Sequence, residues 1–116
     1  MTGNQPVAGH VEEALIIVIP LSRAEGTREE NRRLFQLEDE LIKTIESAGA
    51  GEYDGNEIGE ETFTMYAYGP SADKLFDAVI PVLAQHHLPP GSQVVKRYGK
   101  PGAREDRVRI ENKFVN

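Results

Sequence analysis

The chain has 116 residues, of which 39% are hydrophobic and 28% charged, and its formal net charge is −6. This length suits one domain with a single core, and the composition is too apolar for a disordered chain. The negative charge argues against a nucleic-acid partner, because affinity for phosphates depends on Lys and Arg. The chain has no Cys, which excludes disulfides and thiolate chemistry and is typical of a cytoplasmic protein.

Residues 1–11 are polar, contain Gly and Pro and show no periodicity, which predicts a flexible N-terminal tail before a single α+β domain at 12–116. The apolar run at 14–21 is rich in β-branched residues and predicts a buried central strand that ends near Pro20. Its eight residues fall far short of the roughly 20 that a membrane span requires. Glu12 and Glu13 precede this run in place of basic residues, which argues against a signal peptide. We therefore expect a cytoplasmic protein without membrane contact.

The strongest helix signal lies at 28–48. Thr27 and Glu30 have the spacing of a capping box, in which each side chain bonds the other residue's backbone N–H. Apolar side chains then recur every three or four positions, at Leu34, Leu37, Leu41 and Ile45. This spacing predicts one buried helical stripe, and the glycines at 49 and 51 predict its end.

Residues 62–68 alternate between apolar and polar side chains and predict a half-buried strand. The preceding acidic, Gly-rich residues 51–58 are compatible with a loop or with a short irregular strand. A strand there would pair with 62–68 through a turn around Gly59, and we favour this interpretation. The choice decides between a β-α-β-β-α-β and a β-α-β-α-β order.

A second helix is predicted from Ser71 or Asp73 to about His87, with an irregularity at Pro81, which lacks the N–H of a helical bond. Residues 93–98 and 106–111 then predict two strands joined by a turn. Right-handed crossovers place both helices on one face of the sheet. The expected fold is a ferredoxin-like β-α-β-β-α-β sandwich with an extra C-terminal strand and two helices on one face of an antiparallel sheet.

Two Gly-bearing turns are candidate anion sites. The first is YGPSAD, where Ser71 opens a helix whose free N–H groups attract negative charge. The second is GKPGAR, which carries Lys100 and Arg104. Residues 93–116 hold 7 basic and 3 acidic residues, whereas residues 1–92 hold 6 basic and 16 acidic ones. The basic end is compatible with ion pairs within the fold or with a patch for an anion or partner.

The uncovered sheet face is the candidate interface. Tyr66 and Tyr68 would point into it, and Tyr98 would join them together with Lys96, which shares its parity. Aromatic and basic side chains on a sheet also occur in RNA-binding domains, but the acidic net charge opposes that role. A homodimer explains the exposed tyrosines more simply, because interfaces are enriched in aromatic residues.

The acidic hairpin at 52–61 could hold paired carboxylates for acid–base catalysis, but its spacing fails the calcium-loop pattern. His86 and His87 are adjacent, which is poor geometry for one metal ion. The chain has no nucleophile elbow. We therefore expect no metal, no cofactor and no catalytic residue.

The stretch GEYDGNEIGEETFTMYAYGPSADKLFDAVIPVL resembles a group of small, uncharacterised bacterial proteins with a similar hairpin and a strand–YGP–helix junction. The resemblance covers residues 14–111. It implies a ferredoxin-like domain and implies no activity, so no site residue is carried over from it.

Three functions follow in order of preference. The first is a non-catalytic interaction module that forms a homodimer through the open sheet face or an edge strand, or that binds a protein partner. The second is a regulatory domain that binds a small anion at Ser71 or at Lys100 and Arg104. The third is a small enzyme that uses the acidic hairpin.

Overall fold

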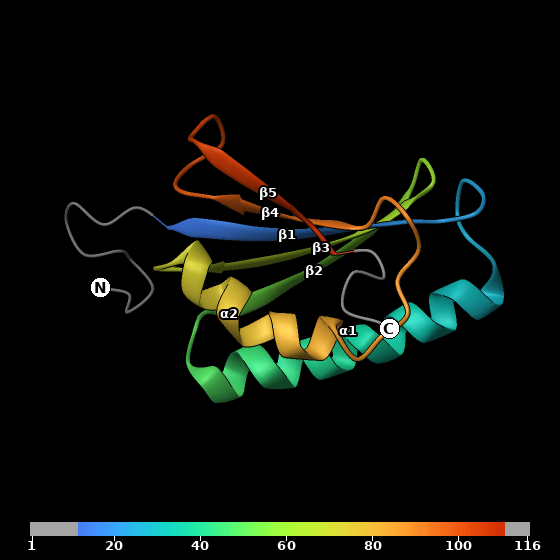
Figure 1. Ribbon diagram of the computed structural model, residues 1–116, viewed down its shortest axis with the longest axis horizontal. Coiled ribbons are helices and arrows are strands. Elements are labelled where there is room, and N and C mark those ends of the chain that lie inside the picture. Colours follow the sequence, from blue (N-terminus) through green and yellow to red (C-terminus); the bar gives the residue numbers. More distant parts are fainter. Residues whose placement is uncertain (1–11, 111–116) are drawn as a thin grey trace.

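The structure is a computed structural model that describes residues 12–110 (Figure 1), so the tail predicted at 1–11 lies outside the described residues. The elements follow the order β-α-β-β-α-β-β, so the fold is of the α+β class. The elements are β1 (Glu13–Pro20), α1 (Arg28–Ala48), β2 (Glu52–Gly59), β3 (Thr62–Gly69), α2 (Ala72–Leu83), β4 (Gln93–Arg97) and β5 (Glu105–Arg109).

The five strands form one sheet in the order β2-β3-β1-β4-β5, and all neighbouring strands are antiparallel. Both helices lie on one face of this sheet (Figure 1), and α1 and α2 also contact each other. The prediction of two helices on one face of an antiparallel sheet with a further C-terminal strand is confirmed. The five-stranded order differs from that of a four-stranded ferredoxin-like sandwich, because β5 extends the sheet beyond β4.

The core lies between the helices and the sheet. Odd-numbered residues of β1 and β3 point into it, because successive strand residues face opposite sides of a sheet. They meet the predicted stripe of α1 and the inner face of α2. The largest fully buried side chains include Leu15, Ile19, Phe63, Met65, Leu37, Leu41, Ile45, Leu75 and Val79. Burial of each such side chain stabilises the fold by about 1.5–3 kcal/mol.

Helix α1 begins and ends as predicted. The side chains of Thr27 and Glu30 form the reciprocal capping box, and Gly49 adopts the left-handed conformation with φ 62° at the C-terminal end. Such a conformation favours Gly, because a side chain there would crowd the backbone.

Helix α2 is shorter than predicted, since it ends at Leu83 and not near His87. Pro81 has no N–H to donate to the preceding turn, and the helix continues for only two residues after it. The N–H groups of Gln85 and His86 then bond the carbonyls three residues earlier, at Val82 and Leu83. Leu88, two residues after these tight turns, is buried.

Strand β2 exists, as favoured, and contains a register shift between Tyr53 and Gly55. The inserted residue lets Tyr53 and Asn56 both face α1, where each bonds Oε2 of Glu38. Without this bulge, side chains three positions apart would point to opposite faces of the sheet. The bulge therefore orients both side chains so that their hydrogen bonds to Glu38 link the edge strand β2 to α1.

The turn between β2 and β3 is formed by Glu60 and Glu61, not by Gly59. Their φ angles are 52° and 68°, a left-handed conformation that is rare for residues with a side chain. The backbone of Glu61 bonds the N–H of Leu21 at 2.7 Å and the carbonyl of Ala24 at 2.9 Å. These two bonds hold the tip of the hairpin against the loop that follows β1.

Candidate functional site

The sheet face opposite the helices has an apolar centre. Ile16 and Val18 of β1 point to this face, because the odd-numbered residues of β1 point into the core. Ile16 lies opposite Tyr66 of β3, and Tyr68 is two positions further along the same strand. All four side chains are half-buried. No helix or strand within residues 12–110 covers them (Figure 1).

Charged side chains border this apolar centre on two sides, and the two sides differ in sign. The register places Glu52 and Glu57 of β2 on the uncovered face, beside Tyr68 and Thr64 respectively. We call these two residues the acidic flank. On the opposite side lies the basic flank, formed by Arg97 of β4 with Arg107 and Arg109 of β5.

One residue of the acidic flank is bonded to the apolar centre. The hydroxyl of Tyr66 donates a hydrogen bond of 2.7 Å to Oε1 of Glu57. This bond to a carboxylate, together with partial burial, raises the pKa of Tyr66 to about 12, because ionisation would place two negative charges side by side. The phenol ring is thereby held over the sheet.

The structure brings Tyr66 and Tyr68 together on this face but does not bring Tyr98 there. Val94 lies opposite the core residue Ile17, so the even-numbered positions of β4 face the helices. The prediction that Tyr98 and Lys96 lie on the open face is therefore wrong. The sequence pattern QVVKRY could not show this, because it has two adjacent valines and either one could point inward.

Tyr98 and Lys96 instead contact the first turn of α2. The hydroxyl of Tyr98 lies 2.7 Å from Oδ1 of Asp73, and Nζ of Lys96 lies 3.1 Å from the same oxygen. The hydrogen bond from Tyr98, with further help from Lys96, holds the pKa of the Asp73 carboxyl below its usual range. Lys96 also lies over the ring of Phe76, 4.8 Å from its centroid.

Of the three residues predicted to bind an anion, Ser71 and Arg104 lie at or near this end of α2. Arg104 stacks on the ring of Tyr98, with Cζ 4.3 Å from the centroid. Lys100 is exposed in the turn between β4 and β5. Ser71 is the N-cap of α2, and its hydroxyl accepts a hydrogen bond from the N–H of Lys74. The structure thus brings Arg104 close to α2 through Tyr98.

The N-terminus of α2 already holds a carboxylate from the chain itself. Oε1 of Glu13 accepts a hydrogen bond of 2.8 Å from the backbone N–H of Ala72. A carboxylate at this position is favoured by the helix dipole. An external anion would have to displace it, which counts against the expected anion site at Ser71. No sequence signal identified Glu13 as the capping group, because it lies 59 residues from its partner.

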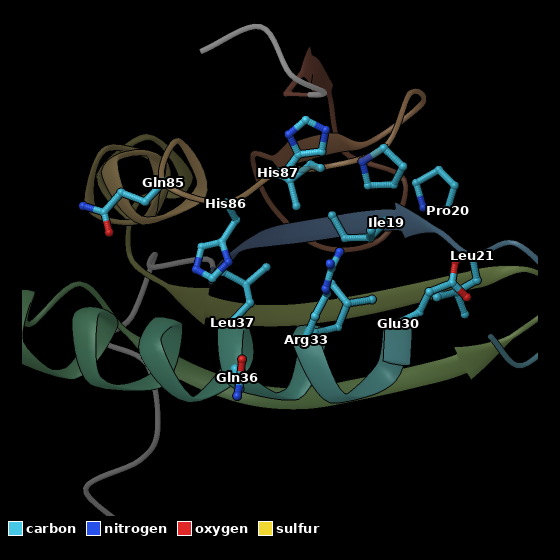
Figure 2. Close-up of a pocket in the computed structure, with 13 residues that line it drawn as sticks. Ile19, Pro20, Leu21, Glu30, Arg33, Gln36, Leu37, Gln85, His86 and His87 are labelled. Carbon is cyan, nitrogen blue, oxygen red and sulfur yellow. The ribbon is translucent and has the colours of Figure 1, made fainter. Parts of the chain in front are cut away.

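A groove of about 420 Å³ opens between α1, the end of β1 and the segment 85–89 (Figure 2). Its walls include the apolar side chains of Ile19, Leu34 and Leu88. The titratable side chains that line it are largely engaged within the chain. Glu30 bonds Ser22 and Thr27, Arg33 pairs with Glu29, and His86 lies 3.2 Å from Glu40. Of the titratable side chains that line the groove, Glu30, Arg33 and His86 therefore already have partners within the chain, and His87 lines the groove beside them.

The acidic hairpin does not assemble a metal centre. Within residues 12–110, no group of three or more Asp, Glu or His side chains is placed to hold a metal ion. Glu57 bonds Tyr66 and turns to the sheet face, while Glu60 and Glu61 form the turn.

No helix of the described part of the chain is long and apolar enough to cross a membrane.

The opposed flanks of the sheet face were only partly visible in the sequence. The basic excess in residues 93–116 indicated that one end of the chain is cationic. Its placement at the edge opposite β2 follows from the strand order alone.

Comparisons of the chain with protein-family models, with curated proteins and with solved structures found no match.

Proposed function

We propose that this protein is a non-catalytic interaction module that forms a homodimer through its uncovered sheet face. The observation that carries the proposal is the apolar centre formed by Ile16, Val18, Tyr66 and Tyr68. A sheet face that stays in water normally alternates polar residues outward. Tyr side chains suit an interface because the ring is apolar and the hydroxyl can keep a polar partner.

The size of this face supports a reversible dimer. Five strands spaced about 4.8 Å apart and about six residues long, at roughly 3.4 Å per residue, cover about 500 Å². Two copies would therefore bury about 1,000 Å², which lies at the lower limit for specific interfaces. We expect an equilibrium between monomer and dimer with a dissociation constant of about 1 µM to 1 mM.

The order of the elements supports placing the domain among ferredoxin-like sandwiches. When β5 is set aside, the remaining strands follow the order β4-β1-β3-β2. In that arrangement each helix connects two parallel strands that are separated by one antiparallel strand. The fold alone implies no activity, so the assignment to an interaction module depends on the sheet face.

The proposal is tested by placing a charge in the apolar centre. Val18→Lys should shift the protein to monomer, because burying an unpaired ammonium in an interface is costly. Ile58→Lys is the matched control, because Ile58 is an exposed aliphatic residue on the helix side of β2. Sedimentation velocity over a concentration series measures the dimer fraction, and circular dichroism verifies folding. A wild-type protein that stays monomeric at about 1 mM, the weak end of the expected range, would refute the proposal, as would equal dimerisation of all three proteins.

A further inference from the structure

The two edges of the uncovered sheet face carry charges of opposite sign. The acidic flank lies on β2 at one edge, and the basic flank lies on β4 and β5 at the other. β2 and β5 are separated by four strand spacings, or roughly 19 Å. This exceeds the Debye length of about 8 Å at physiological salt, so the two flanks do not neutralise each other within one copy.

In a face-to-face dimer with two-fold symmetry, the direction of the axis between the two sheets decides which strands meet, and two limiting directions set strand over strand. If the axis lies between the sheets and runs parallel to β1, the β2 strand of one copy faces β5 of the other. If the axis crosses the strands, β2 faces β2 and β5 faces β5. In an isologous interface each contact occurs twice, so the first arrangement pairs opposite charges twice and the second pairs like charges twice.

We infer that two copies pack about a two-fold axis parallel to β1, with the acidic flank of each copy on the basic flank of the other. The inference rests on the proposed homodimer and specifies its geometry. Like charges placed together at an interface suppress binding, whereas complementary flanks steer encounter and set the register. Charge complementarity therefore selects the axis, and the apolar centre supplies the contact area.

Arg107 of the basic flank can exchange its present partner. Arg107 pairs with Glu105 of the same strand at 3.3 Å, and the Arg107 side chain is 59% exposed. Such exposed pairs are weak and are screened by water. Arg97 of the same flank uses its Nε to donate to the carbonyl of Gly99. Arg107 could therefore accept a carboxylate from a second copy at little cost.

Charge reversal tests the axis. Arg107→Glu with Arg109→Glu keeps Arg97 but makes both flanks acidic in net charge, and Glu52→Lys with Glu57→Lys makes both basic. Each double variant should weaken dimerisation by about tenfold or more, whereas the quadruple variant with both flanks exchanged should recover it. Raising salt from about 0.1 M to 1 M shortens the Debye length from about 10 Å to 3 Å. The added salt should weaken the wild-type dimer, in which it screens attraction, and strengthen the dimers of the double variants, in which it screens repulsion.

Cross-linking measures the same geometry independently of charge. The chain has no Cys, so single Cys residues can be introduced at Thr64 of β3 and Gln93 of β4, which flank Val18 in the same row. An axis parallel to β1 places Thr64 of one copy over Gln93 of the other. A short bismaleimide should therefore join Thr64→Cys to Gln93→Cys in a mixture and leave each variant alone uncross-linked.

The outcomes separate this inference from the proposed function. A dimer that Val18→Lys disrupts, but that is indifferent to charge reversal or strengthened by salt, overturns the axis and leaves the homodimer standing. Absence of the mixed cross-link in a protein that is dimeric by sedimentation does the same. A wild-type protein that is monomeric throughout refutes the proposed function itself.

Discussion

Glu13 and Ala72 connect the start of β1 to the start of α2, because Oε1 of Glu13 accepts the backbone N–H of Ala72 at 2.8 Å. The side chain of Ser71 satisfies a second N–H of the same helical turn, that of Lys74. The first turn of α2 is thus capped from two directions, once locally and once across the fold.

Replacement of Glu13 should cost stability. Glu13→Ala removes a hydrogen bond from a charged acceptor and a favourable charge at the helix N-terminus. We expect the free energy of unfolding to fall by about 1–2 kcal/mol. Urea unfolding followed by circular dichroism measures the change, and Glu12→Ala, an exposed neighbour outside the helix contact, is the control. If the two variants unfold alike, the contact does not stabilise the helix.

The same variant tests the anion site at Ser71. Removal of the Glu13 carboxylate exposes the N–H of Ala72, and inorganic phosphate could then occupy its place. Phosphate should raise the melting temperature of Glu13→Ala more than that of the wild-type protein, because a ligand that binds only the folded state stabilises it. Equal shifts in both proteins would show that α2 does not bind phosphate at this end.

Glu38 should be the main polar link between α1 and the edge strand β2. Its Oε2 accepts hydrogen bonds from the hydroxyl of Tyr53 and from Nδ2 of Asn56. Glu38→Ala leaves both half-buried donors without this acceptor, which should lower the free energy of unfolding by about 1–3 kcal/mol. Asp39→Ala, at an exposed neighbouring position, should have little effect. Hydrogen exchange should also show faster opening of β2 in the Glu38 variant alone.

Replacing Glu61 by Gly in the turn at Glu60 and Glu61 should stabilise the protein. Both residues have positive φ, and two-residue hairpin turns of this kind favour Asn followed by Gly. Glu61→Gly relieves a left-handed strain of about 1–2 kcal/mol, although Gly also loses more backbone entropy on folding. We expect a net stabilisation of about 0.5–1 kcal/mol. Glu46→Gly, inside α1, should destabilise instead, and a loss of stability in Glu61→Gly would contradict the prediction.

Because of Tyr66, the free energy of unfolding should fall as pH rises through the alkaline range. Its pKa is raised in the folded protein, so the folded state keeps the phenol proton more tightly than the unfolded chain does. This stabilisation is fully present below pH 10, near the unfolded pKa, and is lost as pH rises towards about 12. The slope of unfolding free energy against pH in this range should be shallower in Tyr66→Phe. Glu57→Gln should lower the pKa of Tyr66, measured by absorbance at alkaline pH. An unchanged titration would show that Glu57 does not cause the shift.

Local signals in the sequence determined α1 almost to the residue. The capping box at Thr27 and Glu30, the apolar stripe and Gly49 act within a few residues of one another, so their effect on the backbone does not depend on the rest of the fold. The alternation at 62–68 likewise predicted β3. Strand β2 was harder to predict, because its bulge breaks the period of two between Tyr53 and Gly55, and α2 was predicted too long.

The face to which each β4 side chain points was decided by tertiary structure alone. Tyr98 and Lys96 lie under α2 because Val94 pairs with Ile17 across the sheet, a contact between residues far apart in the sequence. The capping of α2 by Glu13 and the placement of the acidic and basic flanks at opposite edges also result from contacts between residues far apart in the sequence. The sequence by itself determined α1, the helix faces and the apolar alternation of β1 and β3, since these follow from neighbouring residues, whereas it favoured strand β2 without deciding it. Only the strand order and register gathered the separated charges onto one sheet face.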